Sequence, residues 1–123
     1  MRKYFMVALG ILFSVLAEAQ TMEEAIQFIK YERFESAKQI LQPLSATNAL
    51  ANYYYGLSVL GADNGNSGIA KEIFQKYPED VANMAGLARI MFIENKAPEA
   101  MSMLTKVVAK AKRKDYLPLK YAA

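Results

Sequence analysis

The sequence predicts an all-α protein built from repeated pairs of helices. After the first twenty positions, apolar residues recur at spacings of three and four, and no stretch alternates with the two-residue period of a half-buried strand. Small residues also recur along the chain at intervals near thirty. With 123 residues, 54% of them hydrophobic, the chain is long enough to form one domain with its own core.

The first nineteen residues have the pattern of a secretory signal peptide. Arg2 and Lys3 precede an apolar run over residues 5–17, and Ala17 and Ala19 are the small residues that a signal peptidase reads. This run is shorter than the roughly twenty residues that cross a bilayer. We therefore expect a mature, soluble protein that starts at Gln20 and resides in the periplasm or outside the cell. An uncleaved membrane anchor is the alternative.

The composition excludes several kinds of chemistry. The chain has no cysteine and no histidine, which removes thiolate nucleophiles, disulfides, histidine relays and the commonest zinc ligands. We expect neither an enzyme nor a cofactor or metal site. The formal charge of +3 is unevenly distributed, which argues against a nucleic-acid-binding face. Many of the basic residues lie near the end of the sequence: Lys106, Lys110, Lys112, Arg113, Lys114 and Lys120.

Turn and cap residues divide the mature chain, residues 20–123, into six expected helices. Breaks are expected at residues 31–33, in the glycine-rich turn 61–68, at Pro78, and at residues 95–96. The carboxylates before the fifth helix suit the positive end of its dipole. The expected helices hold, in order, residues 25–29, 34–44, 48–60 and 69–77, then the residues after Asp80 and those from Pro98 onward.

A small residue recurs at one position of each second helix, with a large apolar residue four positions later. Ala37, Ala70 and Ala100 are separated by 33 and 30 residues and are followed by Leu41, Phe74 and Leu104. The first helices carry Ala25, Gly56 and Ala88 in the same way. Small residues let helices approach closely, so we expect the three second-helix alanines to be buried where helices cross.

These positions resemble the tetratricopeptide repeat family from about residue 21 to residue 111. The residues three positions after the first-helix small residue also fit, as does Tyr77-Pro78 at a repeat end. The chain departs from the pattern because it has no tryptophan, an early Pro43 and a glycine-rich turn in its middle repeat. That turn, with residues 54–57, is also similar to Sel1-like repeats. Either resemblance implies a right-handed solenoid of antiparallel helix pairs, with about three repeats and the start of a further helix.

The resemblance implies a binding surface on the first helices, which line the concave face in this family. Aromatic and basic side chains there would suit a peptide with an acidic group, with Arg89 as a forked cation and Tyr53 as a flat contact. Packing of Tyr53, Leu57 and Phe92 between repeats is the alternative. We also expect at least one hydroxyl of residues 53–55 to face solvent. The residues expected on this face are Lys30, Tyr53, Leu57, Arg89, Phe92 and Ile93.

The leader and the repeat pattern together predict an exported scaffold or adaptor that binds a protein or peptide in the cell envelope. The alternative is a helical envelope enzyme acting on glycans or peptidoglycan, or an accessory subunit of one, which would need two facing carboxylates in a cleft. A third hypothesis is a lipid or nucleic-acid binder that uses the basic end. Residues 117–123 look like the opening of another helix, so the repeats either continue in a longer array or are capped there.

Overall fold

The structure, a computed structural model, describes residues 21–62 and 66–111 of the chain. All regular secondary structure within these ranges is helical, which confirms the all-α prediction for this part of the protein. The predicted leader, the centre of the glycine-rich turn and the basic end from residue 112 onward lie outside the described residues.

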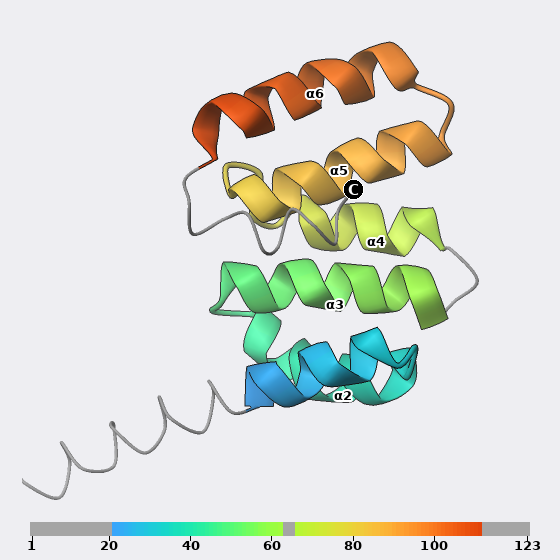
Figure 1. The fold of residues 1–123 in the computed structure, drawn as a ribbon, viewed down its shortest axis with the longest axis vertical. Coiled ribbons are helices and arrows are strands. Elements are labelled where there is room, and N and C mark those ends of the chain that lie inside the picture. Colours follow the sequence, from blue (N-terminus) through green and yellow to red (C-terminus); the bar gives the residue numbers. More distant parts are fainter. Residues whose placement is uncertain (1–20, 63–65, 112–123) are drawn as a thin grey trace, which may run out of the picture.

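The helices follow one another along the long axis of the molecule, and successive helices run in opposite directions (Figure 1). α3 contacts α2, α4 and α5, whereas α6 packs against α5 at one end. The side chains of the first helical segment pack against the same core. In chain order the helices are residues 21–30, α2 (Phe34–Ser45), α3 (Ala49–Ala62), α4 (Ser67–Phe74), α5 (Val81–Ile93) and α6 (Ala97–Lys110).

Side-chain caps fix the starts of α3 and α5. The Ala51 backbone N–H donates to Asn48 Oδ1 at 3.1 Å, and the Asn83 N–H donates to Asp80 Oδ2 at 3.1 Å. Such caps satisfy backbone donors that have no partner within the helix. The expected start of the fifth helix after Asp80 is therefore confirmed, and α3 begins one residue later than expected because Asn48 is its cap.

The predicted bounds of the fourth helix, residues 69–77, were wrong at both ends. Asn66 accepts a bond from the Ile69 N–H at 3.3 Å, so the helix begins at Ser67. It ends at Phe74 rather than continuing to Tyr77. The Tyr77 hydroxyl instead donates to the Ser45 carbonyl at 2.8 Å, which ties the loop after α4 to the end of α2.

Two connections, 63 positions apart in the sequence, use the same backbone turn. The Arg33 N–H donates to the Phe28 carbonyl and the Lys96 N–H to the Met91 carbonyl, both at 2.8 Å. Glu32 and Asn95 lie within these turns with φ angles of 59° and 61°. This left-handed residue closes a helix in the Schellman arrangement. The predicted breaks at 31–33 and 95–96 are confirmed.

The predicted small residues of the second helices are buried. Ala37, Ala70 and Ala100 have no exposed surface, as expected for close helix approach. Phe74 is equally buried, and its ring lies against Gly56 of α3 and Gly86 of α5. A Cβ atom at Gly86 would lie 2.6 Å from the ring. One aromatic side chain of α4 therefore fills the space between the two neighbouring helices.

Two buried asparagines 31 residues apart join α3 to α5. Asn52 Nδ2 donates to Asn83 Oδ1 and to the Ile73 carbonyl, each at 2.8 Å. Asn83 Nδ2 donates to the Ala49 carbonyl at 2.9 Å and to Asp80 Oδ2 at 2.8 Å. Because buried amides are costly without partners, these bonds favour one alignment of the two helices.

Candidate functional site

A hollow of about 280 Å³ lies where the first helical segment, α3 and α5 meet at one side of the molecule. Lys30 and Glu32 reach it from the end of the first segment and the turn that follows. Leu57 and Leu60 of α3 provide apolar surface, and Arg89 comes from α5. Three elements that are distant in sequence therefore supply two cations, one anion and an apolar floor.

Three of the six residues expected on a shared binding face line this hollow. Lys30 and Arg89 are exposed there, and Leu57 is 6% exposed. The side chain of Leu57 is therefore largely packed into the core while it also borders the hollow. Lys30 and Arg89 are the two predicted residues that present charge to solvent at this place.

Tyr53 does not project into the hollow, so its expected role as a flat contact in an open groove was wrong. Its side chain is fully buried, with ring centroids 5.2 Å from Tyr54 and 6.1 Å from Phe74. Burial raises the pKa of its hydroxyl well above the usual value, Tyr54 adds to the increase, and the charge of Arg89 opposes it. Tyr53 is a core residue beneath the site.

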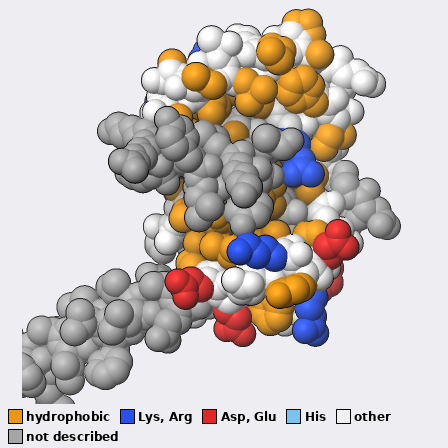
Figure 2. All heavy atoms as spheres, in the orientation of Figure 1, with side chains coloured by type: hydrophobic (Ala, Val, Ile, Leu, Met, Phe, Trp, Pro, Cys, Tyr) orange, Lys and Arg blue, Asp and Glu red, His pale blue; other side chains and the backbone are white. Residues whose placement is uncertain are grey.

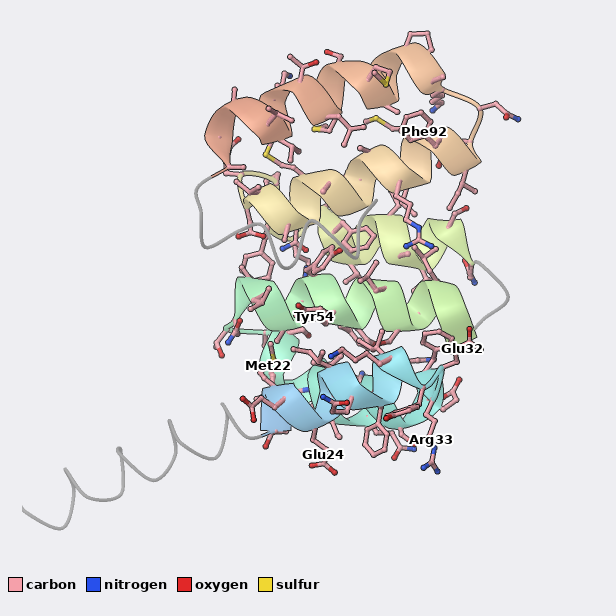
Figure 3. The ribbon with its side chains drawn as sticks, viewed as in Figure 1. Met22, Glu24, Glu32, Arg33, Tyr54 and Phe92 are labelled. Carbon is pink, nitrogen blue, oxygen red and sulfur yellow. The ribbon has the colours of Figure 1, made fainter. Side chains whose placement is uncertain are left out.

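The expectation that one hydroxyl of residues 53–55 faces solvent depends on Tyr55, because Tyr53 and Tyr54 are buried. Tyr54 is 2% exposed, and Tyr55 is only partly exposed. Figure 3 shows Tyr54 beside α3 in the interior of the helical stack. Since α3 has neighbours on several sides, all three rings find helices to pack against.

Phe92 and Ile93 lie away from the hollow, at the C-terminal end of α5. They are 43% and 48% exposed. Phe92 lies between α5 and α6 (Figure 3). Met101 and Val108 of α6 are also exposed. Hydrophobic side chains dominate this end of the visible face, whereas acidic ones gather toward the α2 end (Figure 2).

The three charged side chains of the hollow are not paired with one another or with any other described residue. Within the described part of the chain, Lys30, Glu32 and Arg89 make no side-chain hydrogen bond and no ion pair within 4.0 Å. Glu32 was not among the predicted site residues. Glu32 occupies the same place in the break at residues 31–33 as Asn95 does in the break at residues 95–96. This correspondence is the sequence signal that could have identified it.

A second hollow of about 400 Å³ adjoins the first and shares Glu32, Phe34 and Gly61 with it. The Phe34 ring lies directly over Gly61, where an added Cβ would be 2.6 Å away. Glu35 of α2 also lines this second hollow. The two hollows together extend the site from Arg89 across the end of α3 toward α2.

The carboxylates at the starts of helices have structural partners or lie elsewhere. Asp80 caps α5, and Glu79 Oε2 forms an ion pair with Lys110 Nζ at 3.0 Å. Glu23 and Glu24 border a separate depression on the first helical segment. In residues 21–62 and 66–111 there is no group of three or more acidic side chains arranged to hold a metal ion.

No protein-family model matches the chain, and neither a curated protein nor a solved structure is significantly similar to it. None of the helices in the described ranges combines the length and the apolar character needed to cross a bilayer.

Proposed function

We propose that the protein is an exported scaffold that binds a protein or peptide partner in the hollow bordered by Lys30, Leu57 and Arg89. Its helix pairs would form a right-handed solenoid similar to tetratricopeptide repeats. In this interpretation the first segment, α3 and α5 are the first helices of successive pairs, and each contributes one residue to the site. The gathering of these three residues, which come from three helices, is the observation that carries the proposal.

Recurring contacts support the solenoid interpretation. The same turn follows the first segment and α5, and the buried asparagines of α3 and α5 are 31 residues apart. Repeat proteins stack such units so that each one buries the apolar face of its neighbour. A groove lined by successive first helices then accommodates an extended peptide, because its residues meet successive repeats.

The charge of the hollow supports an anionic group on the ligand. Arg89 offers a planar guanidinium that can donate two parallel hydrogen bonds to a carboxylate, and Lys30 adds a second cation. Leu57 and Leu60 beside them suit an apolar side chain. Tyr53 beneath supports this surface without contacting the ligand.

The test is capture of partners from an envelope extract with the mature protein, followed by titration of a captured partner. Arg89→Ala should weaken binding about 5- to 150-fold, the equivalent of about 1–3 kcal/mol for a charged hydrogen bond. Lys76→Ala, which removes another exposed cation from the loop after α4, is the matched control. Full affinity in Arg89→Ala with unchanged circular dichroism would place the partner on another surface.

Export is tested separately by the intact mass of the protein recovered outside the cytoplasm. Cleavage before Gln20 is the expected result. A product that retains Met1 and fractionates with membranes would contradict the predicted soluble, exported form, whatever the outcome of the binding experiment.

A further inference from the structure

We propose that the hollow selects a peptide end of mixed charge: a terminal carboxylate held by Lys30 and Arg89, an apolar last side chain, and a basic side chain held by Glu32. This inference rests on the proposed peptide-binding function and adds the chemical class of the ligand. It assigns Glu32 as the residue that determines specificity.

The backbone of Glu32 is the first reason to assign it a role. Its φ angle of 59° lies in the left-handed region, which glycine and asparagine occupy more readily than glutamate. The equivalent turn before α6 has Asn95 there, at φ 61°. The chain therefore places a carboxylate beside the hollow at a position where asparagine would fit the backbone better.

The direction of Glu32 is the second reason. It lies at the end of α3, whereas the neighbouring Arg33 lies on the outer side of the turn, toward α2 (Figure 3). The Arg33 guanidinium carbon is 5.5 Å from the centroid of the Phe28 ring, so Arg33 is engaged by a side chain of the first helical segment. Glu32 borders both hollows, whereas Arg33 borders only the second hollow of about 400 Å³.

The separation of the charges is the third reason. No ion pair within 4.0 Å joins Glu32 to Lys30 or Arg89 in the described residues, so the opposite charges do not neutralise one another. A ligand that brings one anion and one cation can therefore pair with both sides. Leu57 and Leu60 lie in the same hollow and suit the apolar side chain between these groups.

The size of the hollow limits which part of a ligand it holds. Its volume of about 280 Å³ lies at the lower edge of the range of roughly 300–1,000 Å³ typical of small-molecule pockets. A chain terminus with one or two side chains fits this space, and the rest of a peptide would continue over the adjoining hollow toward Glu35. The terminus is therefore the part that the three charges recognise.

The experiment measures binding of two synthetic peptides to the mature full-length chain by fluorescence anisotropy. Both carry a free C-terminal carboxylate, one ending in Ala-Gly-Lys-Val and the other in Ala-Gly-Glu-Val, with the dye on an added N-terminal spacer. The wild-type protein should prefer the lysine peptide about 5-fold, and Glu32→Lys should reverse this preference. Amidation of the C-terminus should weaken both peptides. Since exposed charges are screened by salt, the preference should shrink as sodium chloride is raised.

Two further variants test whether the peptide preference depends on the Glu32 carboxylate itself. Glu24→Lys makes the same charge change at an exposed position of the first helical segment, outside the hollow, and should leave the preference intact. Glu32→Asn adopts the residue of the equivalent turn, so it should fold at least as well as the wild type while losing the preference.

An equal affinity for the two peptides in both the wild type and Glu32→Lys would overturn the mixed-charge inference and leave the proposed function standing. No binding of either peptide at millimolar concentration would also overturn it. The proposed function itself fails only if the partner captured from extract is insensitive to Arg89→Ala.

Discussion

α3 and α5 differ from α2, α4 and α6 in how they distribute charge. α3 contains no charged residue and α5 contains only Arg89, while each of the other three helices carries both acidic and basic side chains. α3 accordingly lies among α2, α4 and α5, and most side chains of α3 and α5 are buried. A helix that is apolar on nearly every side needs neighbours on nearly every side. A charge within such a helix, as at Arg89, must reach solvent or a partner.

The largest effect on stability is expected when a glycine of α5 is enlarged. Gly86→Leu should lower the free energy of unfolding by about 3 kcal/mol, because its Cβ would lie 2.6 Å from a Phe74 ring that Gly56 confines on the other side. Urea unfolding followed by circular dichroism measures the change.

The matched control for this prediction is Gly68→Ala on α4. An added Cβ there meets only Asn66 Oδ1, at 3.6 Å, and alanine favours a helix over glycine by roughly 0.5–1 kcal/mol. Gly68→Ala should therefore stabilise the protein. If Gly86→Leu left the unfolding midpoint unchanged, the described packing of α4 between α3 and α5 would be incorrect.

The second prediction compares the two sides of one outer helix. Ala100 has no exposed surface and Ala109 is exposed, although both belong to α6. Ala100→Leu should overpack the contact with α5 and cost about 2 kcal/mol, whereas Ala109→Leu should change stability by less than about 0.5 kcal/mol. Thermal unfolding measures both effects. Equal effects at the two sites would show that the Ala100 side of α6 does not pack against α5.

The third prediction concerns the hydrogen bond between Asn52 of α3 and Asn83 of α5. Asn83→Ala should cost about 1.5 kcal/mol, because the Ala49 carbonyl loses a side-chain donor and the buried Asn52 amide loses one of its two acceptors. A double-mutant cycle with Asn52→Ala should give a coupling energy of about 1 kcal/mol. Strictly additive effects would mean that the two amides stabilise their own helices independently.

The last prediction concerns the stability of the protein in alkaline solution, and no effect is expected at neutral pH. The pKa of Tyr53 is raised in the folded state, mainly by burial, so the unfolded chain releases this proton first as the pH rises. The stability linked to Tyr53 is full below about pH 10 and declines above it by up to about 1.4 kcal/mol per pH unit. Tyr53→Phe should remove this part of the decline. Tyr55→Phe, at a partly exposed ring of the same helix, should leave most of it.

Apolar periodicity and small residues were enough to predict the helices and much of their packing. Ala37, Ala70 and Ala100 could be recognised because close helix approach requires small side chains at repeated positions. The end of α4 could not be predicted from Pro78, because the Tyr77 hydroxyl bonds to α2 and that distant contact helps determine the path of the loop.

The site was harder to predict than the fold. The position of Tyr53 on a first helix did not reveal that other helices cover its ring, since burial depends on neighbours from other parts of the chain. Glu32 was missed because its place beside the hollow follows from a left-handed turn and from the end of α3. Arg89 was identifiable since a lone charge among apolar residues must reach a surface.

The position of Phe74 has a consequence for how the protein opens. Its ring belongs to α4 but fills space beside Gly56 and Gly86, so the core of α3 and α4 is incomplete without α5. In many stacked helical proteins the terminal units fray separately from the rest. Here the loss of α5 would expose this ring to water, so the amide protons of α4 and α5 should exchange with solvent as one cooperative unit.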